Sequence, residues 1–176
     1  MSRLIATMFG VGLLSPAPGT WGSALALLLG MVILRFAGFA GLVAATVAVT
    51  ALGFWACQVE LKNRPGADPS EIVIDEVAGQ WLALLFPAAG FYFSPMGQSL
   101  LQSGGGWLPW PAWVFPFALF RLFDIWKPWL VGRADRRGDA PGVMIDDLWA
   151  GLFAGIMTIM LAVAYHIPLI LMTRSF

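Results

Sequence analysis

Residues 68–79 read DPSEIVIDEVAG and place four acidic side chains within nine residues, directly before an apolar run. The whole chain of 176 residues contains only ten Asp and Glu residues, so this share is large. A second stretch, IDDLWAG at residues 145–151, repeats the pattern, because Asp146 and Asp147 also open an apolar run. Carboxylates at the entrances of apolar helices are costly unless they serve a site. We interpret the two stretches as two walls of one metal site at a membrane surface.

The composition is typical of an integral membrane protein, which we expect to form one domain over residues 1–176. Hydrophobic residues make up 59% of the chain and charged residues only 11%, and the mean hydropathy is +0.79. The single cysteine, Cys57, excludes an intrachain disulfide and a multi-cysteine zinc site. We expect the partners to be the lipid bilayer and a membrane lipid substrate, with no nucleic acid.

The apolar segments predict an all-α bundle of about five transmembrane helices with a polar active site at the cytoplasmic interface. Residues 23–59 are too long for one crossing of a ~30 Å hydrocarbon core, so two short spans with a turn near Arg35–Gly38 are expected. The other spans are expected at residues 72–88, 110–130 and 143–167. Loops are expected at residues 16–23, 60–71, 89–109 and 131–142. Candidate helix N-caps are Ser23, Ser70 and Asp68.

Basic residues are distributed unevenly over the two sides of such a bundle. One side would carry Arg3, Lys62, Arg64, Arg133, Arg136 and Arg137. The opposite side would carry only Arg35 and Arg174. Because Lys and Arg accumulate in cytoplasmic loops, we expect the first side to be cytoplasmic. The acidic stretches lie on that side, so the predicted active site faces the cytoplasm.

The acidic side chains predict a cation site. Carboxylate oxygens suit Mg²⁺ or Mn²⁺ rather than zinc or copper, and several carboxylates at one face repel unless a cation or protons intervene. The candidate ligands are Asp68, Asp75, Glu76, Asp146 and Asp147. An alternative is that acids in a first helical turn are favoured by the helix dipole alone. Gly79 shares a helix face with Asp75 and would allow another helix or a ligand to approach closely.

A third cluster adds positive charge. Arg121, Asp124 and Lys127 follow one another at three-residue spacing, so Arg121 and Asp124 can meet on one helix face. One interpretation is a structural ion pair that holds a polar helix end. In the other, Arg121 and Lys127 bind phosphate oxygens while Asp124 binds metal.

The segment PAPGTWGS at residues 16–23 is a further candidate for binding an anion. It offers free backbone amides and the hydroxyl groups of Thr20 and Ser23, although a plain turn before a membrane helix explains the same residues. Other phosphatase chemistries need residues that the chain lacks. The single histidine, His166, excludes a two-histidine lipid phosphatase mechanism, and no Asp-x-Asp motif of the haloacid dehalogenase kind occurs.

Three blocks of the sequence resemble the phosphatidylglycerophosphatase A family. They are PAPGTWGS (16–23), DPSEIVIDEVAG (68–79) and FRLFDIWKP…GVMIDDLWAG (120–151), in the same order and spacing over most of the chain. The resemblance implies Mg²⁺-dependent removal of the terminal phosphate from phosphatidylglycerophosphate, giving phosphatidylglycerol in the bacterial inner membrane. It also implies functional roles for Asp68, Asp75, Glu76, Arg121, Asp124, Lys127, Asp146 and Asp147.

The candidate residues divide into two groups. The catalytic candidates are Asp75, Glu76, Asp124, Asp146 and Asp147. The candidates for substrate binding are Thr20, Ser23, Arg121 and Lys127. The nucleophile is either a water molecule at a metal site or a carboxylate that becomes an aspartyl-phosphate.

Two other classes of protein fit parts of the pattern. A small multipass carrier that couples cations through buried carboxylates predicts acidic residues near the bilayer midplane. A purely structural membrane subunit predicts that the loss of Asp75 harms assembly more than turnover. Acidic residues at span entrances on one side favour chemistry at the membrane surface instead. The residues predict no particular oligomeric state.

Overall fold

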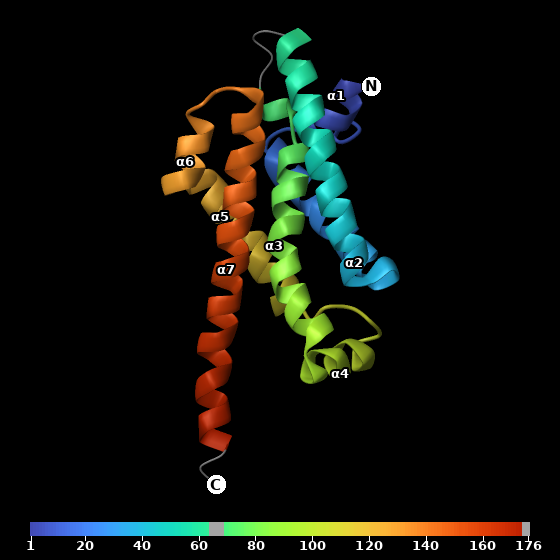
Figure 1. The fold of residues 1–176 in the computed structure, drawn as a ribbon, viewed down its shortest axis with the longest axis vertical. Coiled ribbons are helices and arrows are strands. Elements are labelled where there is room, and N and C mark those ends of the chain that lie inside the picture. Colours follow the sequence, from blue (N-terminus) through green and yellow to red (C-terminus); the bar gives the residue numbers. More distant parts are fainter. Residues whose placement is uncertain (64–68, 174–176) are drawn as a thin grey trace.

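The computed structural model describes residues 1–63 and 69–173, and within them every regular element is helical (Figure 1). The predicted all-α class is therefore confirmed. The chain begins with α1 (Ser2–Ala6) and a short 3-10 turn, η1 (Val11–Leu13). The amide of Val73 donates a hydrogen bond to the carbonyl of Ala6 over 2.9 Å, which ties this N-terminal segment to the chain just before the central helix.

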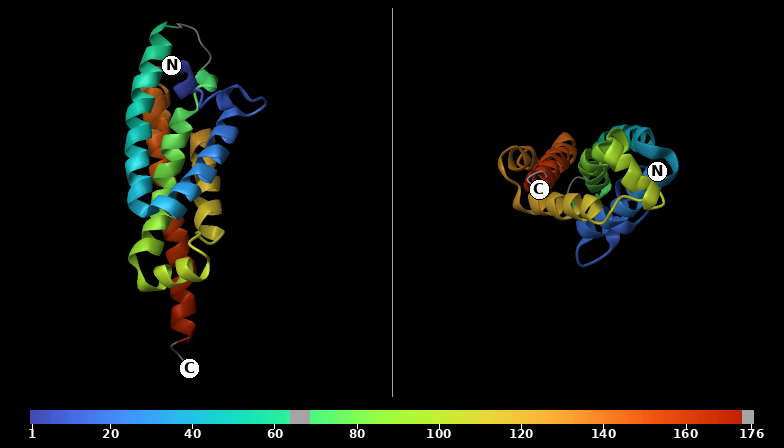
Figure 2. Two further views of the ribbon diagram at one scale, coloured as in Figure 1. Left: turned by 90° about the vertical axis from the view of Figure 1, so that its right-hand side faces the viewer. Right: turned by 90° about the horizontal axis from the view of Figure 1, so that it is seen from below.

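Helix α2 (Pro18–Asn63) is a hairpin rather than a straight rod. Gly38 has φ 69° and ψ −170°, a conformation that glycine adopts far more easily than other residues, and the chain reverses there (Figure 2). This confirms the predicted turn. The prediction of an irregular loop over residues 16–23 is wrong, because α2 already begins at Pro18. A proline is well accepted in the first helical turn, where its missing N–H has no helical partner to lose.

Helix α3 (Ile74–Phe93) continues past the predicted end of its span and is followed by α4 (Pro95–Ser103), bent from it by 98°. Ser94 stands between them and caps α4, since its hydroxyl oxygen accepts a hydrogen bond from the Gly97 amide over 3.0 Å. The predicted loop over residues 89–109 is therefore wrong for most of its length. The Ser-Pro pair was the local signal of a helix start.

The start of α3 has no side-chain cap. Its N-cap position is Val73, and Ser70 lies further upstream in the 3-10 turn η2 (Pro69–Glu71). The prediction that Ser70 caps this helix is wrong. The other candidate cap, Asp68, lies outside the described residues.

The last third of the chain forms α5 (Pro111–Trp126), α6 (Trp129–Asp135) and α7 (Ala140–Thr173). The predicted basic loop over residues 131–142 is thus partly helical. Asp139 precedes α7, and its carboxylate accepts a hydrogen bond from the Gly142 amide over 2.8 Å.

Two of the described helices are long and apolar enough to cross a membrane, namely α2 (Pro18–Asn63) and α7 over Ala140–His166. The bent pair of α3 and α4 provides a third candidate if it counts as one span. Helix α5 has 16 residues, fewer than the roughly 20 of a usual span. The bundle of about five spans therefore stays a prediction, although membrane association is well supported by these apolar helices.

Helix α3 is the centre of the bundle, with α2 on one side and α7 on the other (Figures 1 and 2). The indole N–H of Trp81 donates to the carbonyl of Ala26 over 2.7 Å, which fixes α3 against the first arm of α2. The fully buried side chains of Ile74, Leu84 and Met144 belong to the core that these helices share. This packing brings the beginnings of α3 and α7 together.

Candidate active site

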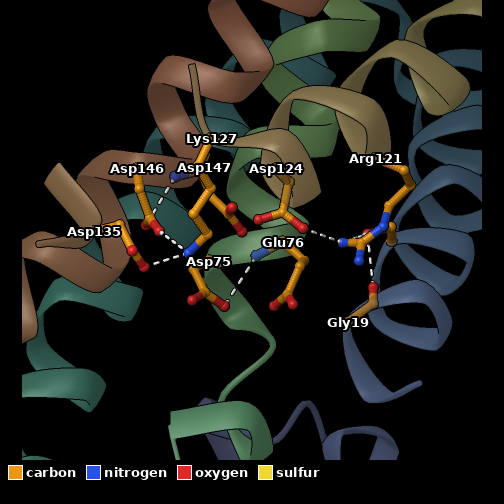
Figure 3. Close-up of polar contacts among 10 residues, drawn as sticks. Gly19, Asp75, Glu76, Arg121, Asp124, Lys127, Asp135, Asp146 and Asp147 are labelled. Atoms are coloured by element: carbon orange, nitrogen blue, oxygen red, sulfur yellow. Dashed lines mark hydrogen bonds and ion pairs between the residues drawn. The ribbon is translucent and has the colours of Figure 1, made fainter. Parts of the chain in front are cut away.

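Three carboxylates from two helices meet at one end of the bundle. Oxygen atoms of Asp75, Glu76 and Asp147 all lie within 4.8 Å of one another (Figure 3). Asp75 and Asp147 are buried, with exposed fractions of 7% and 3%. Two negative charges 4.8 Å apart repel by about 3 kcal/mol at an effective dielectric constant of ~20. The group therefore needs a cation or bound protons to be stable.

A close crossing of α3 and α7 brings these carboxylates together. A Cβ atom at Gly79 would lie 2.5 Å from the carbonyl oxygen of Asp147, and one at Gly151 would overlap the carbonyl oxygen of Gly79. The close approach predicted at Gly79 is thus present. Asp75 and Asp147 each precede the glycine of their own helix by four residues, about one turn. The crossing therefore places these two side chains on facing surfaces.

The first acid of each sequence pair contacts the backbone of the second. An Asp75 carboxylate oxygen accepts a hydrogen bond from the Glu76 amide over 3.0 Å. Asp146 does the same for the Asp147 amide, also over 3.0 Å. The Glu76 amide lies in the first turn of α3, where the helix dipole favours negative charge, whereas Asp147 is the eighth residue of α7 and its amide lies inside that helix. The dipole interpretation therefore fits Asp75 and Glu76 but is wrong for Asp146 and Asp147, because α7 already begins at Ala140.

Asp146 lies apart from the group of three. One of its carboxylate oxygens is 3.2 Å from the ammonium nitrogen of Lys127, which also forms an ion pair with Asp135 (Figure 3). Partial burial opposes the charge on Lys127, but its hydrogen bonds to Asp135 and Asp146 outweigh burial and raise its pKa above the ordinary value. Lys127 is therefore charged at neutral pH, between two carboxylates from α6 and α7.

Arg121 is held on two sides. Its Nη1 atom lies 2.8 Å from a carboxylate oxygen of Asp124 and donates a hydrogen bond to the hydroxyl of Ser23 over 3.2 Å. The contact between Arg121 and Asp124 is the one that their spacing predicts. The Ser23 hydroxyl also donates to the carbonyl of Gly19 over 2.7 Å. Ser23 lies inside α2 and orients Arg121, so its predicted role as a helix cap is wrong.

The N-terminal end of α2 closes the site. Gly19 lies so near the cluster that a Cβ atom there would overlap the carboxylate of Glu76 and lie 3.3 Å from both terminal nitrogens of Arg121. A larger residue at this position would displace the ends of the Glu76 and Arg121 side chains. Figure 3 shows the carboxyl group of Asp124 next to that of Asp147, with Arg121 beyond it. Acidic and basic side chains from α3, α5 and α7 therefore share one site, next to Gly19 and Ser23 of α2.

Several buried polar atoms near this centre have no partner among the described residues. They are Oε2 of Glu76, Nε of Arg121 and both amide atoms of Gln80. Gln80 is fully buried and follows Glu76 by four residues, so both lie on one face of α3. Buried polar groups in proteins normally have partners. Sequence reasoning missed Gln80 and Gly19, although an amide in an apolar run one turn after Glu76 was a usable signal.

One predicted residue, Thr20, is not part of the assembled centre. Thr20 is exposed and makes no side-chain hydrogen bond within the part of the chain that the structure describes. Asp68 lies outside the described residues. The remaining candidates gather at this end of the bundle, and their arrangement offers hard oxygen ligands beside a fixed guanidinium. The fold and the site together define a helical membrane protein whose polar centre suits the chemistry of a phosphate ester.

Comparison with known proteins gives the family. The model of the family described as phosphatidylglycerophosphatase A matches residues 4–162. A protein of Haemophilus influenzae named phosphatidylglycerophosphatase A is 33% identical over 88% of this chain and 85% of its own length. The protein of that name from Escherichia coli is 30% identical over 95% and 86%. The chain belongs to the phosphatidylglycerophosphatase A family, and it is a phosphatase.

Another relative bears a different name. A protein of Bacteroides thetaiotaomicron, whose name proposes a phosphatidylinositol-3-phosphatase, is 34% identical over 88% of this chain and 89% of its own length. No solved structure matches the chain. Family membership does not favour the carrier interpretation.

Proposed function

We propose that this phosphatase hydrolyses the terminal phosphomonoester of phosphatidylglycerophosphate to phosphatidylglycerol and phosphate, with Mg²⁺ as its cofactor. The observation that carries the proposal is the group of Asp75, Glu76 and Asp147, with oxygens within 4.8 Å of one another, beside the fixed guanidinium of Arg121. A phosphomonoester carries negative oxygens arranged as a tetrahedron. Its hydrolysis therefore needs carboxylates that bind a cation as well as a positively charged side chain. Family membership supports the choice of lipid.

The donor set fits Mg²⁺. All three groups are carboxylates, which hard cations prefer, and Oε2 of Glu76 is buried without a partner among the described residues. Asp75, Glu76 and Asp147 would hold the ion. When bound, Mg²⁺ supplies stabilisation of the negative charge that develops on the phosphoryl group.

The residues of the chain orient the phosphate and handle protons. Arg121, restrained by Ser23 and Asp124, offers its remaining N–H groups to phosphoryl oxygens. The oxygen of an attacking water forms a bond to phosphorus while the bond from phosphorus to the glycerol oxygen breaks. A carboxylate of the cluster accepts the proton of the water, and the leaving oxygen takes up a proton to become the hydroxyl of phosphatidylglycerol.

We place the site on the cytoplasmic side of the bacterial inner membrane. The acidic centre lies at the same end of the bundle as α6 and the C-terminal end of α2, which carry Arg133 and Lys62 (Figure 1). Arg35 lies next to the turn at Gly38, at the opposite end. The bias of basic residues toward the end with the site supports a cytoplasmic orientation.

Phosphate release by the purified protein in detergent tests this function. We expect phosphate release from phosphatidylglycerophosphate with Mg²⁺ and none with EDTA. Asp75→Asn should lower the rate by about 100-fold or more, because it replaces a charged ligand of Mg²⁺ by a neutral one. Asp139→Asn is the matched control, since Asp139 is 48% exposed and contacts Arg137 rather than the cluster. Phosphatidylinositol 3-phosphate and phosphatidic acid serve as comparison substrates.

Each part of the proposal has its own negative result. Full activity in EDTA would overturn the role of Mg²⁺. Faster release from phosphatidylinositol 3-phosphate than from phosphatidylglycerophosphate would overturn the substrate. A phosphoenzyme trapped on Asp75 would replace direct attack by water with an aspartyl-phosphate mechanism.

A further inference from the structure

We propose that a groove between the end of α5, α6 and α7 receives an acyl chain of the lipid substrate and directs its headgroup to the carboxylates. This inference rests on the proposed function, because it assumes a phospholipid substrate. The groove, which we call the lateral groove, has a volume of about 500 Å³. That size is within the ~300–1,000 Å³ of ordinary ligand sites. Figure 1 shows α6 and the end of α5 beside α7.

The walls of the lateral groove are almost wholly apolar. The side from α5 and α6 is formed by Phe123, Trp126 and Trp129. The side from α7 is formed by Phe153, Ile156 and Met157. Trp126 and Trp129 are 69% and 83% exposed, and Ile156 is 43% exposed, so the groove is open along the apolar surface of the bundle. Hydrocarbon is the kind of molecule that meets such a surface in a membrane.

One charged residue, Lys127, lines this apolar groove and connects it with the active site. Lys127 is part of the lining, and its ammonium nitrogen lies 3.2 Å from a carboxylate oxygen of Asp146. The next residue, Asp147, belongs to the group of three carboxylates. The groove therefore ends at a cation adjoining the catalytic centre. This is the order of groups in the substrate, where the acyl chains are connected to an anionic headgroup.

The turn that bears Lys127 has an unusual backbone. Lys127 and Trp129 have φ values of 51° and 42°, on either side of Pro128. Non-glycine residues rarely adopt positive φ, and such strain is found mainly where the surroundings fix a functional geometry. Here the turn swings α6 away from the axis of α5 and opens the groove beside α7. The strained backbone at Lys127 and Trp129 thus lies at the lateral groove that an acyl chain would occupy.

The lateral groove would orient a chain more than it would attract one. Lipid tails are as apolar as the groove, so a chain gains little free energy on leaving the bilayer for it. The benefit is positional, because a chain fixed in the groove brings the phosphate to the carboxylates in a limited range of orientations. Misplacement of a reacting group by about 1 Å can cost about 100-fold in rate.

A substitution that fills the groove tests the inference. Met157→Trp places a large ring in the lateral groove, and Val47→Trp is the matched control, because Val47 is 65% exposed on α2, away from the groove. The substrates are dioleoyl phosphatidylglycerophosphate and its dihexanoyl analogue, whose short chains do not need the groove. We expect Met157→Trp to lower kcat/KM for the dioleoyl lipid at least about tenfold and to leave the dihexanoyl value within about twofold.

The outcomes separate this inference from the proposed function. If the wild type hydrolyses both lipids and Met157→Trp lowers both rates equally, or neither, the acyl-chain role is overturned while the function stands. If the wild type releases phosphate from neither lipid, the proposed function fails, and the inference fails with it. Normal activity of Val47→Trp with both lipids is required for a selective loss to count as support.

A measurement without any substitution covers the case in which Met157→Trp does not fold. The wild type is labelled with a phosphatidylglycerophosphate that carries a photoreactive diazirine on one acyl chain. We expect labelled peptides from residues 123–129 and 153–157, and we expect excess dioleoyl phosphatidylglycerophosphate, but not phosphatidylcholine, to suppress them. Equal suppression by both lipids would show that bulk membrane lipid occupies the groove, and this would overturn the inference.

Discussion

The crossing of α3 and α7 predicts that one added methyl group disables the enzyme. In Gly79→Ala the new Cβ would lie 2.5 Å from the Asp147 carbonyl oxygen and 2.5 Å from Cε2 of Phe120, whereas ordinary contacts begin at 3.4 Å. The helices must therefore separate by about 0.9 Å, which is the difference between these distances. We expect this to destabilise the fold by about 3 kcal/mol, in the upper part of the range for overpacked cores. Because Asp147 and Asp75 lie on opposite sides of this gap, we expect turnover to fall by about 100-fold.

The assay combines thermal unfolding in detergent with phosphate release from phosphatidylglycerophosphate. Gly151→Ala should behave like Gly79→Ala, since its Cβ would overlap the carbonyl of Gly79. Gly90→Ala is the matched control on α3, because nothing lies within 4 Å of its Cβ position. It should be neutral or up to about 1 kcal/mol more stable, as alanine favours helix. Wild-type turnover and unfolding temperature in Gly79→Ala would refute the idea that this crossing assembles the site.

Three further predictions concern single contacts. Ser23→Ala removes the hydroxyl that accepts from Arg121 and should lower kcat/KM about tenfold, as expected for a hydrogen bond to a charged group; an unchanged kcat/KM would contradict this role. Gln80→Leu removes two buried polar atoms that have no partner among the described residues. It should raise the unfolding temperature and lower turnover. A rise in both the unfolding temperature and turnover would mean that the amide has no part in activity. The Arg137 hydrogen bonds and the Gly142 amide lower the pKa of Asp139 below its ordinary 3.8, so its contribution to stability is complete above about pH 4 and is lost as the pH falls through the lowered pKa. Asp139→Ala should therefore reduce the unfolding temperature at pH 7, with a difference from wild type that shrinks below pH 4; a constant difference would contradict the assignment.

The sequence predicted the long apolar elements well and the short ones poorly. The turn within residues 23–59 was predictable because the segment exceeds the length of a span and Gly38 permits a reversal. Helices α4 and α6 were missed, because the Gly, Pro and basic residues of these regions suggested loops. Ser94 and Pro95 start α4 within a region whose overall composition is that of a loop.

The residue types of the candidate site were predictable from the sequence, but which acidic residues meet in the structure was not. The two acidic pairs look equivalent in sequence, yet only Asp147 of the second pair joins Asp75 and Glu76. Successive helix positions are about 100° apart, so the point where two helices cross decides which acid of a pair faces inward. That point depends on the glycine contacts between α3 and α7, which no single segment reveals. Gly19 was missed because its neighbours, Glu76 and Arg121, come from other helices, whereas the position of Gln80 one turn after Glu76 was a signal within its own segment.

The right-angled bend at Ser94 fixes the distance between the carboxylates at the start of α3 and helix α4 at its end. Helix α3 has 20 residues, which corresponds to about 30 Å at 1.5 Å per residue and equals the thickness of a typical hydrocarbon core. It carries the carboxylates at one end and the perpendicular α4 at the other. With α3 as a span, α4 resting on the far surface would set the depth of the carboxylates below the near surface. Turnover should then depend on how thick the surrounding membrane is, in addition to the identity of the lipid being cleaved.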